Sequence, residues 1–475
     1  MPDTDIAVIG AGTAGTAVAT LAAALGLRVT LFERDRMGGR RLHGGGLAGQ
    51  ALLRCAQAAQ AIRDGGRFGV RAADLAVDWD AVRAHLRAVA EAVAPEVSEA
   101  RFAGMGVEVV RAAAYFAGPR SLQAGGRSWR FRRCVIAAGS EPLVPADLMG
   151  LGEVSALTPD TLLQLEQPPG HLLMLGSGPE ALELAQAHAR LGCLVTVVAA
   201  ERFAPAEDPD LALGLRDALE RDGITVLEGQ PAVRVARQEL GLELLLADGR
   251  RVTGTHLVLA LGRVPRLAPL DLPVGGVRFS VLGVETNAAL RSPSNRRVWA
   301  AGSAANPAGA GPQHPGATAA EHAGLLLRSL LFQLPARLSA RPLPRTTFTA
   351  PALLQVGLTA EAAAAAGHEV RTQRFPLSAT DRAAADGLEG GLVKLVADSR
   401  GRLLGAGVLA PDAAEMAGLL QRLVAQRSRL SALAALALPS PTLAEGTKRA
   451  AAEFYAPLVT GPWARKLARL ARLLP

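Results

Sequence analysis

The amino-acid sequence predicts an α/β protein with two similar strand–helix–strand units and a C-terminal α+β domain. Two glycine-rich segments, Gly10-Ala-Gly-Thr-Ala-Gly15 and Gly176-Ser-Gly-Pro-Glu-Ala181, each follow an apolar run and open a helical pattern. From about residue 345 the pattern changes to short strands and helices in alternation. A chain of 475 residues is too long for one core, so about three domains are expected.

The first glycine segment has the sequence pattern of a Rossmann-like dinucleotide site. Residues 5–9 are predicted to form a buried strand, and residues 16–25 a helix whose N-terminus attracts phosphate. A second strand over residues 28–33 ends in Glu33, placed to bind the ribose hydroxyls of an adenosine. The tight turn and the close approach of the pyrophosphate need the small residues Gly10, Gly12 and Gly15.

The second segment repeats this order with a strand at 171–175, a helix at 180–191 and a strand at 194–198. Its fingerprint residues are Gly176, Gly178 and, in third place, Ala181. The second strand ends at Ala199 instead of an acid, and the nearest cation is Arg202, beside Glu201. Arg202 either binds the 2′-phosphate of NADPH or is a solvated surface charge, so the choice between NADH and NADPH stays open.

The order of motifs predicts four domain segments. Residues 1–150 carry the first unit, with a helical stretch near 78–100 and a return strand that ends at Ala138, Gly139 and Ser140. Residues 151–270 carry the second unit and close with Gly262, and residues 271–344 return to the first domain through Gly302 and Ser303. Residues 345–475 form the α+β domain, with strands predicted at 345–349, 392–397 and 403–409 and helices near 359–366, 412–426 and 441–455.

Composition argues against nucleic-acid binding as the function. The formal net charge is +8 and the pI about 10.3, but the arginines are dispersed and no stripe of aromatic and basic residues exists to stack bases. Nucleic-acid binding is therefore the least expected function.

The three cysteines show no metal-ligand spacing, so no metal site is expected at them. The sequence has neither a signal peptide nor a stretch of about 18 apolar residues that could span a membrane. A soluble cytoplasmic protein is therefore expected.

The pattern of apolar and basic residues from Trp463 to Leu474 predicts a basic amphipathic helix. Its apolar residues at helical spacing are Trp463, Leu467, Leu470 and Leu474, and the cations between them are Arg465, Lys466, Arg469 and Arg472. Such a helix more often packs onto its own domain, and the alternative is contact with an anionic membrane surface.

The chain resembles the flavoprotein (pyridine nucleotide) disulfide reductases, in particular the mercuric reductase and dihydrolipoamide dehydrogenase branch. The resemblance rests on both fingerprints, on the AAGS, ALGR and AAGS sequences at 137–140, 260–263 and 300–303, and on phrases at 348–351, 356–359 and 441–445. It implies that the first unit binds FAD, with Gly39 among the contacts, that the second binds NADH or NADPH, and that the C-terminal domain forms a homodimer.

The chain departs from that family at its redox centre. The family's CxxxxC pair aligns with Arg41 and Gly46 in the segment 38–53. Thiol–disulfide exchange needs a thiolate, which neither residue supplies. Cys55 lies nine residues further along the predicted helix, roughly 13 Å away at a rise of 1.5 Å per residue. Disulfide reduction is therefore not expected.

Three further positions differ from the family. The lysine near the flavin aligns with Gln50, although its glutamate partner remains as Glu183. The His–Glu dyad contributed across the dimer aligns with Ser440 and Glu445, and a serine cannot shuttle protons near neutrality. The aspartate that binds the flavin ribitol aligns with Ser303, which replaces a charge-assisted hydrogen bond with a neutral one.

These departures suggest an FAD-dependent NAD(P)H oxidoreductase that passes electrons from the flavin directly to a quinone, a dye, oxygen or a similar small acceptor. The glycines at 44–46 are expected to leave open space above the ring, at a helix N-terminus. Polar candidates around that space are Arg41, His43, Gln50, Glu183, His314, Ser440 and Glu445. The alternative is a catalytically inactive homologue with a structural or regulatory role.

Overall fold

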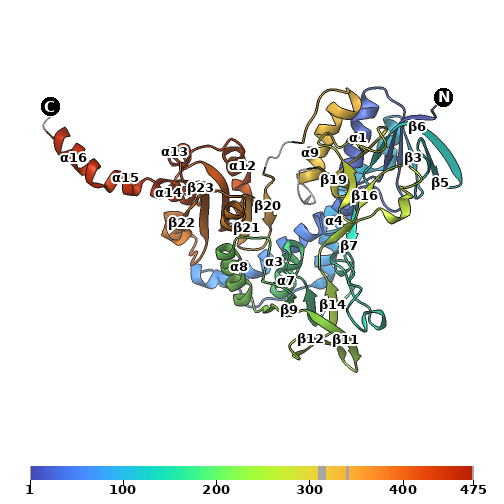
Figure 1. The fold of residues 1–475 in the computed structure, drawn as a ribbon. Helices are drawn as coiled ribbons and strands as arrows, with labels where there is room; N and C mark the ends of the chain where they lie inside the picture. Colours follow the sequence, from blue (N-terminus) through green and yellow to red (C-terminus); the bar gives the residue numbers. More distant parts are fainter. Residues whose placement is uncertain (1, 309–316, 339–341, 473–475) are drawn as a thin grey trace. The chain divides into compact units, whose positions relative to one another are not determined.

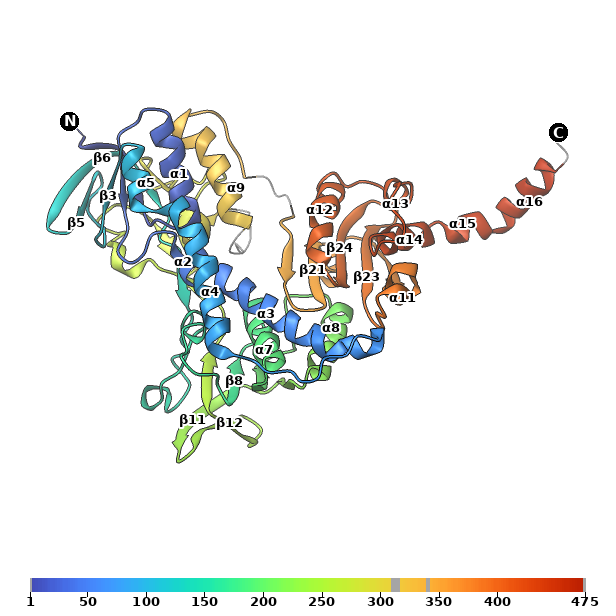
Figure 2. The ribbon, with the colours of Figure 1, turned by 180° about the vertical axis from the view of Figure 1, so that it is seen from behind.

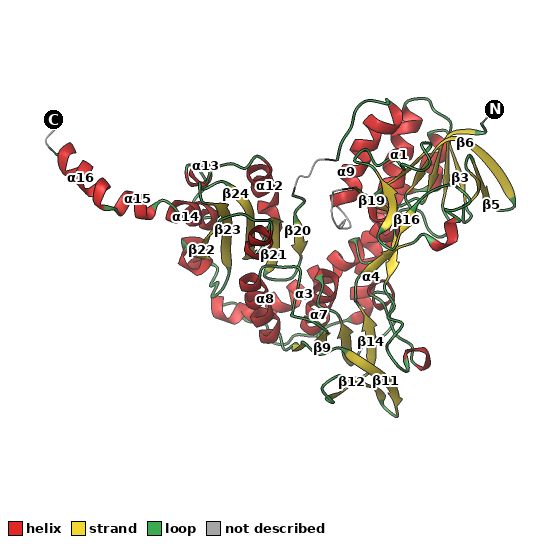
Figure 3. Ribbon diagram, in the orientation of Figure 1, coloured by secondary structure: helices red, strands yellow, loops and turns green. Residues whose placement is uncertain are grey.

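The computed structural model describes residues 2–308, 317–338 and 342–472, and its chain divides into two compact units (Figures 1 and 3). The first unit holds Met1–Ala200 and Leu227–Ala340, and the second holds Glu201–Val226 and Arg341–Pro475. Each unit has its own apolar core. The mixed α/β class of the first unit and the α+β pattern of the second confirm the predicted fold class.

A seven-stranded sheet forms the centre of the first unit, in the order β3-β2-β1-β6-β5-β4, with β18 also paired to β6. Its parallel strands are β1 (Thr4–Ile9), β2 (Val29–Phe32), β3 (Val107–Val110), β6 (Arg127–Ile136) and β18 (Val298–Ala300). Antiparallel pairing adds β4 (Tyr115–Gly118) and β5 (Ser121–Ala124). Parallel strands covered on both faces must be apolar throughout, which explains the continuous hydrophobic runs. Through β18 the late segment of the chain returns to the first sheet.

The turn between β1 and α1 (Thr13–Ala24) shows why its glycines are required. Gly10 has a φ of +102°, and a Cβ at this position would lie 2.4 Å from the carbonyl oxygen of Ala137. A Cβ on Gly15 would lie 1.9 Å from the carbonyl oxygen of Gly10. Only hydrogen fits in either place, so the helix starts directly against the strand ends.

The second fingerprint lies on a four-stranded sheet in the order β10-β9-β8-β14. Its elements are β8 (His171–Leu175), α7 (Pro179–Arg190), β9 (Leu194–Ala199), β10 (Thr225–Glu228) and β14 (His256–Leu259). An antiparallel sheet of β11 (Ala232–Gln238), β12 (Gly241–Leu246) and β13 (Arg251–Gly254) follows. The strands β7 (Ser140–Pro142) and β15 (Arg263–Pro265) pair antiparallel, which brings the two return segments together.

The second unit is built on a five-stranded antiparallel sheet with the order β20-β21-β24-β23-β22. These strands are β20 (Arg345–Thr347), β21 (Ala352–Gly357), β22 (Val370–Pro376), β23 (Leu392–Asp398) and β24 (Leu403–Ala410). The helices α12 (Ala417–Ala425) and α14 (Glu445–Glu453) pack on the sheet. The helix α8 (Pro209–Arg221) also packs on it, where Leu211 lies against Gly407.

The remaining helices and strands complete both units (Figure 2). In the first unit they are α2 (Gly39–His43), α3 (Leu47–Asp64), α4 (Trp79–Val93), α5 (Glu99–Gly104), α6 (Pro159–Leu162), α9 (Ala317–Leu326), β16 (Phe279–Ser280), β17 (Gly283–Thr286) and β19 (Ala305–Pro307). In the second they are α10 (Ala360–Ala365), α11 (Asp381–Ala385), α13 (Leu430–Ala434), α15 (Ala456–Thr460) and α16 (Pro462–Ala471). Among the described residues, every helix is too short or too polar to cross a bilayer.

A buried lysine ties helix α8 to the sheet of the second unit. The ammonium of Lys394, on β23, lies 2.8 Å from the carboxylate of Asp208 and also pairs with Asp210. The side chain of Lys394 is only 7% exposed and that of Asp208 only 3%. Removing one partner of such a pair leaves an uncompensated charge away from water.

We expect Lys394→Met to lower the free energy of unfolding of the second unit by about 3–5 kcal/mol, because the buried carboxylate of Asp208 loses its counter-charge. The measurement is urea unfolding followed by circular dichroism. Arg382→Met is the control, since its pair with Asp386 is exposed and contributes at most about 1 kcal/mol. Equal shifts for the two variants would contradict this account.

Candidate functional site

The segment that replaces the family's dithiol motif passes close to the first fingerprint. Gly38 and Gly39 adopt φ values of +90° and +55°, and α2 and then α3 follow. A Cβ on Gly39 would lie 3.0 Å from the Cα of Gly12, so the two backbones are nearly in contact. Helix α3 starts immediately after Gly46, which confirms the predicted helix N-terminus.

The first fingerprint has the features that a dinucleotide requires. A Cβ on Gly12 would meet nothing within 4 Å, so the space before the N-terminus of α1 is open to a phosphate group. The carboxylate of Glu33 is buried and accepts hydrogen bonds of 2.8 Å from the backbone amides of Ala11 and Asp35. These amides fix the acid at the end of β2, where the sequence predicts an adenosine ribose. The residues present fit FAD.

A histidine that the sequence analysis did not single out lies beside the predicted flavin contacts Gly302 and Ser303. His322, on α9, is fully buried, and its Nδ1 accepts a hydrogen bond of 3.1 Å from the amide of Gly302. Burial lowers the pKa of His322 to about 4, so the ring is neutral at physiological pH. The other nitrogen, Nε2, is buried and has no hydrogen-bond partner among the described residues. The only sequence signal that could have pointed to this residue is that it is a lone histidine in the alanine-rich stretch 317–323.

Four charged side chains from four separate segments meet between the two fingerprints. Arg40, on α2, pairs with Glu180 in the first turn of α7 and lies 3.5 Å from the carboxylate of Asp160 on α6. Arg263, at the start of β15, lies 2.9 Å from Asp160 and 3.8 Å from Glu180. We call these four residues the ionic cluster. Two guanidinium groups therefore balance two carboxylates at one place.

Backbone and hydroxyl groups extend the ionic cluster. The amide of Gly45 donates to Asp160 over 3.3 Å, and Arg263 donates to the hydroxyl and the carbonyl of Ser140 over 3.2 Å. Burial alone raises the pKa of Asp160, but the charge and hydrogen bond of Arg263, the charge of Arg40 and the amide of Gly45 outweigh it. The net pKa is below the ordinary value for an aspartate, so Asp160 is ionised at neutral pH.

The expectation of open space at residues 44–46 is wrong for the described structure. A Cβ on Gly44 would lie 2.6 Å from a carboxylate oxygen of Asp160, and a Cβ on Gly45 would lie 2.5 Å from one of Glu180. A Cβ on Gly46 would lie 2.7 Å from the carbonyl oxygen of Arg41. The glycines make room for the carboxylates of the ionic cluster and for their own loop, so other atoms occupy the place that a Cβ would take at each of these positions.

Two of the predicted polar residues lie apart from the ionic cluster. The guanidinium of Arg41 is 45% exposed and lies 3.8 Å from the carboxylate of Glu96. The ring of His43 is hydrogen-bonded through Nε2 to the carbonyl of Met37 over 2.8 Å, on the exposed side of α2. Their roles in binding or catalysis stay predictions.

The other predicted residues are distributed over both units. Gln50 is exposed on α3, and Glu183 is half-buried on α7. In the second unit, Ser440 is exposed and Glu445 begins α14, while the guanidinium of Arg202 donates to the carbonyls of Pro205 and Glu207. His314 lies outside the described residues.

The cysteines carry no exchangeable pair. Cys55, Cys134 and Cys193 are all free, and burial raises the pKa of each thiol, to about 11 for Cys193. A raised pKa leaves little thiolate at neutral pH, which lowers the reactivity of each sulfur. Among the described residues, His, Cys, Asp and Glu side chains form no cluster suited to a metal ion.

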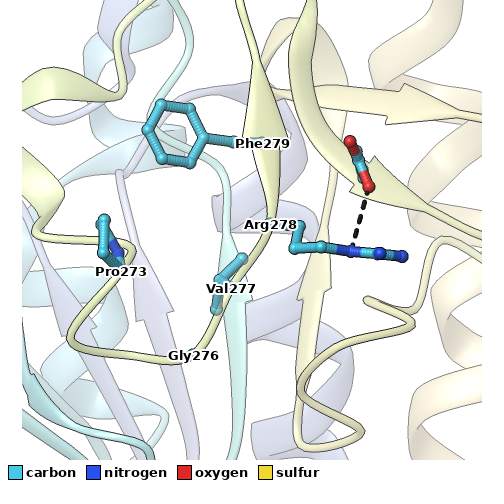
Figure 4. A pocket seen from close by; sticks show the side chains of 6 residues that line it. Pro273, Gly276, Val277, Arg278 and Phe279 are labelled. Atoms are coloured by element: carbon cyan, nitrogen blue, oxygen red, sulfur yellow. Dashed lines mark ion pairs between the residues drawn. The ribbon is translucent and has the colours of Figure 1, made fainter.

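A hollow elsewhere on the first unit does not coincide with the predicted site. It is lined by Pro273, Gly276, Val277, Arg278, Phe279 and Glu285. Among these residues, the guanidinium of Arg278 forms an ion pair of 3.2 Å with the carboxylate of Glu285 (Figure 4). None of these lining residues belongs to a fingerprint or to the ionic cluster.

Comparison with known proteins agrees with the fold and the motifs. Residues 4–324 match the family model described as pyridine nucleotide-disulphide oxidoreductase, and residues 343–451 match the dimerisation domain of the same family. A mercuric reductase from Streptomyces lividans is 33% identical over 463 residues, which cover 95% of this chain and 96% of that protein. A dihydrolipoyl dehydrogenase from Thermus scotoductus is 33% identical, with 94% and 96% covered.

Solved structures show the same fold. LpdA from Mycobacterium tuberculosis superposes with a TM-score of 0.83 at 25% identity, covering 95% of this chain and all of that one. The flavoprotein disulfide reductase RclA from Escherichia coli gives a TM-score of 0.83 at 23% identity, covering 94% and 99%. The fold and the two fingerprints define a two-dinucleotide flavoprotein class, whose members typically bind FAD and NAD(P)H. The chain belongs to the pyridine nucleotide-disulphide oxidoreductase family and carries its dimerisation domain.

We expect Asp160→Asn to destabilise the first unit at neutral pH by about 1–3 kcal/mol, since Arg263 and Arg40 lose a counter-charge. Because the pKa of Asp160 is lowered by folding, its stabilising effect is present above the ordinary aspartate value of 3.8. That effect is lost as the pH falls through the lower pKa of the folded state.

The check is urea unfolding of the wild type and the variant at neutral and at acidic pH. The difference between the two proteins should shrink as the solution is acidified. The exposed Asp147, changed to Asn, is the control and should show little difference at either pH. A constant difference for Asp160→Asn across the pH range would contradict the assigned charge interactions.

Proposed function

We propose that this protein is an FAD-dependent NAD(P)H oxidoreductase that passes electrons to a small acceptor, such as a quinone, a dye or oxygen, without a disulfide intermediate. The observation that carries the proposal is the pairing of an intact first fingerprint with a redox motif that has no sulfur. The space at Gly12 and the buried Glu33 favour a bound dinucleotide. The motif positions hold Arg41 and Gly46.

In this proposal the first unit holds FAD. When bound, FAD supplies an acceptor for hydride and a donor of electrons to a second substrate. The N-terminus of α1 would neutralise the pyrophosphate, and Glu33 would bind the ribose hydroxyls. The remaining contacts would come from small residues at the strand ends, namely Gly10, Gly15, Gly39, Ala138, Gly139, Ser140, Gly302 and Ser303. Because its Nδ1 accepts a hydrogen bond from the amide of Gly302, His322 would position the turn at residues 302–303.

The second fingerprint, which also lies in the first unit, would bind NADH or NADPH at the N-terminus of α7. A Cβ on Gly178 would meet nothing within 4 Å, so a phosphate can approach the backbone there, while Gly176 and the buried Ala181 keep the turn compact. Gly262 has a φ of +107°, and a Cβ on it would also meet nothing within 4 Å. Glu180 in the same first turn would by itself repel an anionic ligand. The guanidinium groups of Arg40 and Arg263 offset that charge. Arg202, the sequence candidate for a 2′-phosphate contact, belongs to the other compact unit and stays a prediction.

The chain's own residues argue against a sulfur relay. Gly46 is confined by the backbone of Arg41, so a cysteine side chain at this position would require the loop to move. The three native thiols are separate, and their pKa values are raised by burial. Gln50 and Ser440 also lack the charge and the proton affinity of the residues that align with them in the family. Electrons would therefore leave from the flavin edge to a dissociable acceptor.

The testing experiment is anaerobic titration of the purified protein with NADH and with NADPH, followed at the flavin absorbance. We expect a yellow protein that bleaches with at least one nicotinamide and recovers its colour when a quinone or oxygen is added. A colourless protein whose fold accepts no added FAD, or a yellow protein that neither nucleotide bleaches, would overturn the proposal.

We further expect activity to be insensitive to thiol reagents. Alkylation of the nicotinamide-reduced protein and the Cys55→Ser substitution should each leave the rate of dye reduction within about twofold of the wild type, because no thiol takes part. Alkylation after unfolding is the control, and it should label all three cysteines. Loss of most of the activity on alkylation of the folded, reduced protein would place a cysteine in the reaction.

A second candidate is a catalytically inactive member of the family with a structural or regulatory role. The observation that favours it is the ionic cluster, because Asp160, Glu180 and Arg40 occupy the room beside Gly44 and Gly45. This candidate predicts an unchanged flavin spectrum with either nucleotide. The same anaerobic titration therefore separates the two candidates.

A further inference from the structure

The C-terminal end of the second unit is a pair of short helices, α15 and α16, that projects from the rest of the unit (Figures 1 and 2). The match to the family's dimerisation domain ends at residue 451, before these helices begin. These two helices therefore lie outside the part of the chain that matches the family model.

Helix α16 presents an apolar face to solvent. Trp463, Leu467 and Leu470 follow one another at i, i+4 and i+7 and are 77%, 61% and 54% exposed. Leu458 and Val459 on α15 are also exposed, and no residue of α15 or α16 is buried. The expectation that the terminal helix packs onto its own domain is thus wrong for the described residues, since nothing in its unit covers this face. Leu474, predicted for the same face, lies outside them.

The remaining surface of α16 is strongly basic. Its cations are Arg465, Lys466, Arg469 and Arg472. Between Phe454 and the end of the sequence there is no aspartate or glutamate, so these charges have no local acidic partner. The ammonium of Lys466 lies 5.7 Å from the centre of the Trp463 ring, at the border between the apolar face and the charged one.

We propose that α16 binds the surface of an anionic lipid bilayer. Large apolar side chains on one face and lysine or arginine on the other are the features of helices that lie in the interface plane of such a membrane. The helix has ten residues and spans roughly 15 Å, about half the hydrocarbon thickness, so it would lie on the bilayer and not cross it. The tryptophan would sit at the level of the headgroups.

The charge of α16 favours a bilayer over a second copy of the chain as the partner that covers its apolar face. Two copies joined through this face would bring both sets of four cations along one seam, with no acidic residue of α15 or α16 to offset them. An anionic lipid surface supplies the opposite charge and an apolar interior together. The basic face alone would suit a nucleic acid, but that ligand would leave Trp463, Leu467 and Leu470 in water.

The experiment uses the full-length protein and two kinds of vesicle, one of phosphatidylcholine alone and one of phosphatidylcholine with phosphatidylglycerol. We expect co-sedimentation with the phosphatidylglycerol vesicles only, weakened by salt. We also expect a blue shift of the tryptophan fluorescence, because Trp463 is exposed while Trp129 and Trp299 are buried and Trp79 is half-buried. Equal binding to both vesicles, or binding to neither, would overturn the proposal.

Two sets of variants sharpen the test. Leu467→Glu should abolish vesicle binding, and the control Leu240→Glu, at a 94% exposed position of the first unit, should leave it unchanged. Replacing Arg465, Arg469 and Arg472 by Gln should weaken binding by roughly fivefold for each charge removed. Both sets should keep the flavin content and nicotinamide response of the wild type, so a failure here is distinct from a failure of the proposed function. If Leu467→Glu instead converts a dimer to a monomer, the face is an interface between copies and the lipid proposal is wrong.

Discussion

The ionic cluster is the constraint on which the rest of the candidate site depends. Two arginines and two carboxylates come from α2, α6, α7 and β15, and they join the segment 38–46 to the second fingerprint. Removing any one of these charges would leave another partly buried and uncompensated. The glycines at 44 and 45 follow from the same constraint, because a side chain on either would displace a carboxylate.

This arrangement connects the loss of the cysteines to the geometry around them. In place of a sulfur relay the segment carries Arg40, whose charge holds Glu180, and Gly46, which lies against its own loop. Under the proposed function, a flavin in the first unit has no thiol pair with which to exchange electrons, and its electrons pass to a molecule that can diffuse away. The first fingerprint, with Glu33 held by two amides, needs none of the missing thiols to bind its ligand.

The C-terminal helix adds a separate property to the family fold. The apolar face of α16 and its four cations belong to residues beyond the matched dimerisation domain. The proposal that α16 binds a bilayer is independent of the proposal that a flavin reduces small acceptors. They are compatible, because a quinone acceptor is itself a membrane-soluble molecule.

The sequence by itself determined the two fingerprints, the order of strands and helices around them, the change to an α+β domain near residue 345 and the absence of a dithiol pair. These features are local: a glycine turn, an apolar period or a missing cysteine can be read within a few residues. Only the tertiary structure brought Asp160, Glu180 and Arg263 to Arg40, because these residues are separated by as many as 223 positions along the chain. It also filled the space expected at Gly44 and Gly45, buried His322 against Gly302 and left the apolar face of α16 in solvent. Long-range packing decides which side chains share a charge or a cavity, and no local pattern contains that information.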